Sequence, residues 1–122
     1  MAGLTTAYSQ TLLDYAFPTS GAGDHIAYSA NGTSETGSLA RTAVGATGWA
    51  AATAADPSIK ANNALLTSAA ASGAFTVTHF AIYSASSGGT QKTDWQAVGS
   101  QRVLAIGDKT EWAIGSCQVT LT

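Results

Sequence analysis

The chain has 122 residues, of which 45% are hydrophobic and only 10% are charged, and its formal net charge is −2. Its five lysines and arginines are too few for a basic surface that neutralises phosphates, so we expect no nucleic-acid partner. No stretch is apolar over the thickness of a bilayer, and the first residues lack the regions of a secretory signal. We therefore expect no membrane partner and no secretion by a standard signal.

The length fits a single domain, 1–122, in which a helix at 1–17 precedes a β-sandwich at 24–122. A surface with so few charges repels its neighbours weakly, which favours association with other protein molecules. The alternative is a monomer whose surface is solvated by Ser, Thr, Asn and Gln.

The first predicted element is a helix that begins near residue 4. Its apolar stripe consists of residues spaced three or four apart: Leu4, Tyr8, Leu12 and Tyr15. Thr5 or Thr6 can cap the first turn, and Pro18 disfavours further helix, so we expect the helix to end around Ala16. A helix this short is not stable alone, so its stripe must pack on the chain's own sheet or on another subunit.

Short strands separated by Gly and Ser turns are predicted along the rest of the chain. They cover 25–29, 39–44, the segment around Trp49, 58–66, 75–83, 95–98, 102–106, 110–114 and 118–122. In 58–66 we take Ile59, Ala61 and Leu65 as the apolar positions. The Ala-rich run 50–55 favours helix by propensity, and this conflict stays open.

The last strands are predicted to form one sheet. Residues 102–106 and 110–114 flank a Gly-Asp-Lys turn and read as a hairpin. The strand 118–122 is expected to pair within the same sheet.

The clearest strand is 75–83, where β-branched and aromatic residues dominate. His79 and Tyr83 share one face with smaller apolar residues, and Phe80 lies on the other, so both faces have something to bury. This pattern predicts a central strand. Gly88 and Gly89 follow in a small-residue loop that we expect to be exposed. Together the elements predict a mainly β fold, an antiparallel β-sandwich or small barrel with one N-terminal α-helix.

The search for chemistry yields no active site. His79 is a candidate general base for a small hydrolase, with Asp94 or a serine nearby, but a histidine at a strand edge or a subunit contact, bonded to a carbonyl, is the favoured interpretation. The histidines and the cysteine, at 25, 79 and 117, lack the close spacing of a zinc site. Cys117 is expected to be a buried small hydrophobe. We expect no enzymatic activity, no cofactor and no metal.

Four motifs follow one another along the chain: LLDYAF at 12–17, IKANNALL at 59–66, VTHFAIYSASSGG at 77–89 and LAIGDKTEWAIGSCQVTLT at 104–122. In this order they resemble a group of small virion proteins encoded by tailed bacteriophages, variously called tail fibre or head decoration proteins. The resemblance spans most of the chain, and its motifs are structural. It places His79 at the family's strand histidine, which implies a packing role.

The resemblance implies a structural protein located in the virion and assembled in the bacterial host cytoplasm. Compact size and low charge favour a capsid decoration protein that binds the major capsid protein as a homo-oligomer, with a trimer favoured. The alternative is a tail or tail-tip protein that contacts the host surface. The candidate subunit or capsid contacts are Leu4, Tyr8, Leu12, Tyr15, His79, Tyr83, Gly88 and Gly89.

Overall fold

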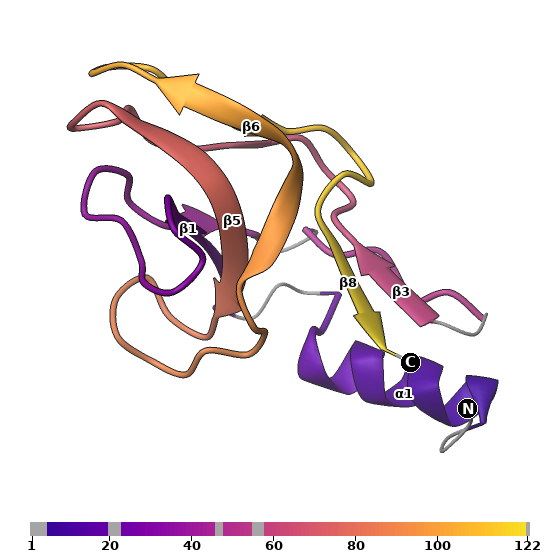
Figure 1. The fold of residues 1–122 in the computed structure, drawn as a ribbon. Helices are drawn as coiled ribbons and strands as arrows, with labels where there is room; N and C mark the ends of the chain where they lie inside the picture. The colour runs from indigo at the N-terminus through magenta and orange to yellow at the C-terminus, as the bar shows by residue number, and fades with distance from the viewer. Residues whose placement is uncertain (1–4, 20–22, 46–47, 55–57, 122) are drawn as a thin grey trace. The chain divides into compact units, whose positions relative to one another are not determined.

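The computed structural model describes residues 5–19, 23–45, 48–54 and 58–121. It contains one helix, α1 (Thr6–Ala16), within these ranges (Figure 1). The strands are β1 (His25–Ser29), β2 (Thr42–Ala43), β3 (Ser58–Ala61), β4 (Leu66–Thr67), β5 (Phe75–Tyr83), β6 (Gln96–Leu104), β7 (Glu111–Trp112) and β8 (Gln118–Leu121). The predicted mainly β fold, with antiparallel pairing and an N-terminal helix, is confirmed. No helix in the described part is long and apolar enough to cross a membrane.

The chain forms two compact units that interleave in sequence. The helix unit comprises Met1–Ala22, Val44–Leu66 and Trp112–Thr122, and the sheet unit comprises Gly23–Ala43 and Thr67–Glu111. Each unit is built from segments far apart in the chain, so neither could be recognised as a continuous stretch. The single domain expected over 1–122 stays a prediction.

The sheet unit is organised around β5. The strands of its sheet lie in the order β2-β1-β5-β6, so β5 has a paired neighbour on each side (Figure 1). Phe80 and Ile82 are buried on one face, and Val77 and Ala81 are buried on the other. The prediction of a central strand with two covered faces is confirmed.

β6 departs from a regular ladder beside β5. Val77 pairs with Arg102 and His79 pairs with Ala97, so two steps along β5 (77 to 79) correspond to five along β6 (102 to 97). The extra residues form a bulge, which bends and twists an edge strand. The sequence predicted two short strands here, 95–98 and 102–106, but the structure has one strand with an irregular middle.

The predicted hairpin of 102–106 with 110–114 is wrong. The turn between them exists, with the Asp108 N–H donating to the Ala105 carbonyl at 3.0 Å, but β7 pairs with β4 instead of β6. Ser68 and Thr110 exchange hydrogen bonds, because the Ser68 N–H reaches the Thr110 carbonyl and the Thr110 N–H reaches Ser68 Oγ. A segment from earlier in the chain therefore takes the place that a hairpin partner would occupy.

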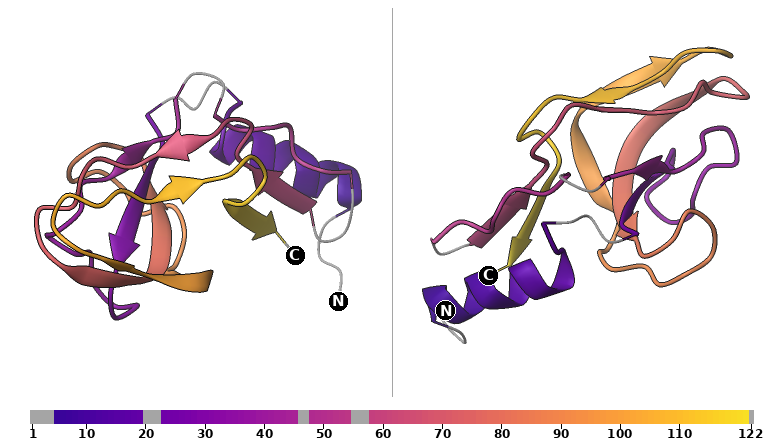
Figure 2. Two further views of the ribbon diagram at one scale, coloured as in Figure 1. Left: turned by 90° about the horizontal axis from the view of Figure 1, so that it is seen from above. Right: turned by 180° about the vertical axis from the view of Figure 1, so that it is seen from behind.

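β8 also pairs outside the four-stranded sheet. It lies antiparallel to β3, with Ile59 opposite Thr120 and Ala61 opposite Gln118, in a separate two-stranded sheet. The expectation that all closing strands share one sheet is therefore corrected. Figure 2 shows this pair beside α1, within the helix unit.

α1 ends at Ala16 as the sequence indicated, but it begins at Thr6, later than the predicted start near residue 4. Thr5 caps it, because its Oγ1 accepts the Tyr8 N–H at 3.2 Å, and the Phe17 N–H closes the last turn on the Leu13 carbonyl at 2.9 Å. The buried face carries Ser9, Leu13 and Phe17, and the Phe17 ring meets Trp49 edge-on with centroids 5.7 Å apart. The helix does not pack through its predicted stripe, since Tyr8 lies outside this face.

β3 turns its polar side chains inward. The buried residues of this strand and the position after it are Ser58, Lys60 and Asn62. Ile59 is only half-buried and Leu65 is 57% exposed, so the predicted apolar face is not the buried one. The inversion is stable because each buried polar group has a partner. Ser58 Oγ donates to the Thr53 carbonyl, and Lys60 Nζ lies 2.6 Å from the Asp14 carboxylate.

Asn62 joins the segments around it. Its Nδ2 donates to the carbonyls of Ala64 and Ala113, both at 2.9 Å, and to that of Trp112 at 3.3 Å. Its Oδ1 accepts the Cys117 N–H at 2.9 Å. A buried amide with these partners holds the 112–117 turn against the end of β3.

The described part of the Ala-rich run, 50–54, is not helical. The Ala50 N–H donates to the Ala61 carbonyl at 2.8 Å, and the Thr53 N–H donates to the Ile59 carbonyl at 3.0 Å. Pairing with β3 therefore overrides helix propensity here. Residue 55 lies outside the described residues.

Candidate interaction site

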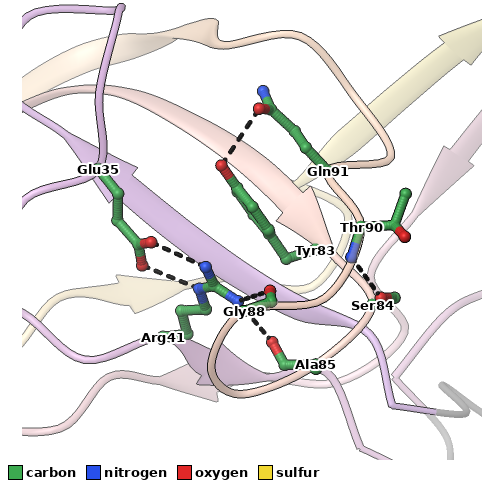
Figure 3. A network of polar contacts seen from close by, with 8 residues as sticks. All are labelled: Glu35, Arg41, Tyr83, Ser84, Ala85, Gly88, Thr90 and Gln91. Carbon is green, nitrogen blue, oxygen red and sulfur yellow. Dashed lines mark hydrogen bonds and ion pairs between the residues drawn. The ribbon is translucent and has the colours of Figure 1, made fainter.

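The loop after β5 is closed at its base by hydrogen bonds. The Ser84 N–H donates to the Thr90 carbonyl at 2.9 Å, and the Thr90 N–H donates back to Ser84 Oγ at 2.8 Å (Figure 3). Gly88 and Gly89 have φ values of 62° and 72°, a region that strongly favours glycine. Both are exposed, as we predicted. The residues 85–89, which we call the Gly-Gly loop, therefore project from a closed base.

Arg41 binds the backbone of the Gly-Gly loop. Its guanidinium binds both carboxylate oxygens of Glu35, at 2.8 and 2.9 Å, and also donates to the carbonyls of Ala85 and Gly88, each at 2.8 Å (Figure 3). The Arg41 side chain is only 7% exposed. The hydrogen bond to Glu35 raises the pKa of Arg41 and outweighs the opposing effect of burial. A planar fork of donors can join a carboxylate and two carbonyls in this way, whereas an ammonium group has no such fork.

The Tyr83 ring packs against the Arg41 guanidinium. The guanidinium carbon lies 3.9 Å from the centroid of the Tyr83 ring, a cation–π contact. The ring also lies 6.2 Å from that of Trp95, and its hydroxyl donates to Gln91 at 3.1 Å. Because the Tyr83 ring, Arg41 and the loop are linked by these contacts, the loop conformation is set before any partner binds.

Residues of the same unit lie over His79 and Tyr83. Arg41 covers Tyr83, and a Cβ at Gly32 would come within 2.9 Å of the His79 ring. Both covering residues belong to the connection between β1 and β2. Contacts of His79 and Tyr83 with another subunit stay a prediction.

His79 is held in place by a neighbour in sequence. Its Nδ1 lies 2.8 Å from Thr78 Oγ1, and it is half-buried. Asp24 pairs with Lys92, while the His25 ring bonds the Gly23 carbonyl, so these adjacent residues reach different partners. Over the described residues, no group of His, Cys, Asp and Glu could hold a metal ion.

The helix candidates lie in the other unit. Tyr8 is 54% exposed and Tyr15 is 85% exposed, while Leu12 is half-buried. Leu4 lies outside the described residues. The predicted contacts thus fall into two groups, one on α1 and one around the Gly-Gly loop.

Arg41 and Glu35 were not among the residues predicted from the sequence. One signal was available: Arg41 falls within an otherwise uncharged segment, 39–45, in a chain with few charges. Lys and Arg are rarely buried without a partner, so a charge among apolar neighbours indicates a buried pair. The partner could not be named, because the loop carbonyls come from residues more than forty positions away.

Comparison with known families identifies the chain. The family model of the Podophage GP4 fiber I protein gp80 matches residues 5–120. The chain belongs to this fibre protein family. It is therefore a structural protein of a phage virion, and the resemblance to tailed-phage virion proteins is confirmed. No curated protein matches this fibre-family chain.

Proposed function

We propose that this protein is a component of a fibre on the phage particle, that it performs no chemical step, and that the Gly-Gly loop is one of its contact surfaces. The proposal is carried by the hydrogen bonds of Arg41 to the Ala85 and Gly88 carbonyls, which we call the Arg41 clamp. They order an exposed loop of small residues. A loop held in one conformation loses little further entropy when it binds, so a rigid contact surface favours affinity. The family name, which refers to a fibre, supports the same assignment.

The sequence favoured a capsid decoration protein bound to the major capsid protein, and the family name favours the alternative. In the proposed fibre, copies of the chain contact one another as a homo-oligomer, with three copies the preferred number. Low charge supports such contacts, because few ionised groups must lose water on association. Assembly takes place in the host cytoplasm and involves neither nucleic acid nor membrane.

The bonding of His79 supports a role without catalysis. Its ring is bonded to Thr78, and no carboxylate bonds it among the residues that the structure describes. A general base is normally oriented by an acidic or carbonyl partner behind it. His79→Ala is therefore expected to affect the packing of Gly32 and to remove no activity.

Immunogold labelling of intact particles tests the location. We expect label on projections from the particle. Label spread evenly over the capsid shell would overturn the fibre assignment and restore the decoration protein.

A charge placed in the loop tests the contact surface. Ser87→Asp, in the exposed loop, should reduce incorporation into particles, while Ser100→Asp, at an exposed position of β6, should not. Equal incorporation of both variants would contradict the role of the loop.

A further inference from the structure

α1 has two faces of different character. With 3.6 residues per turn, Ser9, Leu13 and Phe17 lie along one side of the helix, and this side is buried. Tyr8, Leu12 and Tyr15 lie along another side, on which both tyrosines are exposed and Leu12 is half-buried. Tyr15 is 85% exposed, although large aromatic rings are more often packed against other residues.

Polar side chains fix which face points outward. Gln10 Nε2 donates to the Ala52 carbonyl at 2.9 Å, and Asp14 Oδ1 accepts the Ala52 N–H at 2.8 Å. Gln10 and Asp14 are four residues apart on one side of α1, and together they bind the backbone N–H and carbonyl of Ala52. Asp14 also binds the buried Lys60 at 2.6 Å. The helix cannot turn its tyrosines inward without breaking these bonds.

The outward face has the spacing of a helix-packing seam. The steps from Tyr8 to Leu12 and from Leu12 to Tyr15 are four and three residues, which is the d-a-d pattern of a heptad. The only charged residue of α1 is Asp14, and it is engaged on the docked side. Two copies of the face can therefore meet without burying like charges, so it is complementary to itself.

We propose that Tyr8, Leu12 and Tyr15 form the contact between α1 of one copy and α1 of a second copy of this chain. This inference rests on the proposed function only where it assumes that copies meet in the fibre. An aromatic side chain buries about 150–250 Å² at most, so three side chains supply less than the roughly 800 Å² per partner of a standard interface. The seam is one part of a larger contact, and association through it is reversible.

Cysteine crosslinking tests the seam directly. The native thiol, Cys117, is fully buried and should give little background. Tyr8→Cys and Tyr15→Cys are treated with diamide, which takes two electrons and two protons from two thiols as the disulfide forms. Ala7→Cys, exposed on a different side of α1, is the matched control. Covalent dimers in either single variant indicate parallel helices, and dimers only in the mixture indicate antiparallel helices. Both results support the proposal, whereas dimers in neither case, or equally in the control, overturn it.

A second measurement uses added charge. Tyr8→Glu should weaken self-association by roughly tenfold or more, because a carboxylate would be buried at the seam without a partner. Ala7→Glu adds the same charge at the adjacent residue and should leave association unchanged. Sedimentation over a range of concentrations gives the two dissociation constants, and circular dichroism checks that α1 stays folded. If both variants associate as the unchanged protein does, the seam is wrong while the fibre assignment stands. Immunogold label on the capsid shell, together with weakened association of Tyr8→Glu, would instead mean that the fibre assignment is wrong while the seam stands.

Discussion

Lys60 Nζ lies 2.6 Å from a carboxylate oxygen of Asp14, and the lysine side chain is completely buried while that of Asp14 is 39% exposed. The pair joins α1 to β3 across 46 positions of sequence. It also explains why β3 turns a lysine inward and leaves Ile59 half-buried. Among the residues that the structure describes, Asp14 is the one carboxylate paired with this buried charge, which makes the contact a sensitive point of the helix unit.

Asp14→Asn should destabilise the protein by about 1–3 kcal/mol, because Lys60 then lacks its counter-charge. The cost is below the roughly 3–5 kcal/mol of a fully buried pair, since water reaches Asp14 and screens the interaction. Urea unfolding measures the change. Adding Lys60→Met to Asp14→Asn should restore part of the loss, because no buried charge remains. An unchanged unfolding midpoint for Asp14→Asn would show that the pair adds nothing.

Stability should fall in acid through the same carboxyl group. Burial raises the pKa of Asp14, but the hydrogen bonds from Lys60 and the Ala52 N–H, together with the lysine charge, lower it below 3.8 overall. A carboxyl group whose pKa is lower in the folded state stabilises the protein at pH values above its ordinary pKa. This contribution is lost as the pH falls through the pKa of the folded state. Unfolding midpoints measured from pH 6 to pH 2 should thus drop less steeply below about pH 4 in Asp14→Asn than in the unchanged protein. Parallel curves would contradict this account.

Arg41→Lys should loosen the Gly-Gly loop while preserving the charge. An ammonium group cannot bind Glu35 and both loop carbonyls in the same geometry. We expect the amides at the loop base, Ser84 and Thr90, to exchange hydrogen roughly tenfold faster, which corresponds to about 1.4 kcal/mol. Arg102→Lys, at an exposed position on β6, is the control and should leave these amides unaffected. Similar exchange in both variants would remove the clamp from the explanation of the loop.

Asn62→Asp should be strongly destabilising although it changes few atoms. The amide nitrogen of Asn62 faces three carbonyls, those of Ala64, Trp112 and Ala113. A carboxylate there would place oxygen against oxygen at a buried site, with an expected cost of about 3 kcal/mol or more. Asn63→Asp is the matched control, because Asn63 is the next residue and its side chain is exposed. Thermal unfolding of the two variants should separate them clearly, and equal midpoints would contradict the role of Asn62.

Cys117 should be unreactive in the folded protein. Burial raises the pKa of its thiol to about 12, so almost no thiolate exists at neutral pH. A thiol reagent such as DTNB should label it only at the rate of unfolding. Rapid labelling without denaturant would mean that the 112–117 segment opens readily.

The sequence by itself determined the elements that depend on neighbouring residues. α1 ends at Ala16 ahead of Pro18, the strand 25–29 was predicted with its observed bounds, and the alternation in 75–83 indicated a central strand. Such signals are local, because a cap, a proline or a period of two acts within a few residues. The exposed Gly88-Gly89 turn was predictable for the same reason.

Tertiary structure alone decided the partners. β7 pairs with β4 instead of β6, β3 buries Lys60 in place of Ile59, and Arg41 reaches the loop at Gly88. In each case a polar group finds its partner from another part of the chain, and that partner reverses what the neighbouring residues favour. Burying a charge or a backbone carbonyl is unfavourable until a specific partner arrives, so its placement follows from the assembled fold and not from the residues beside it.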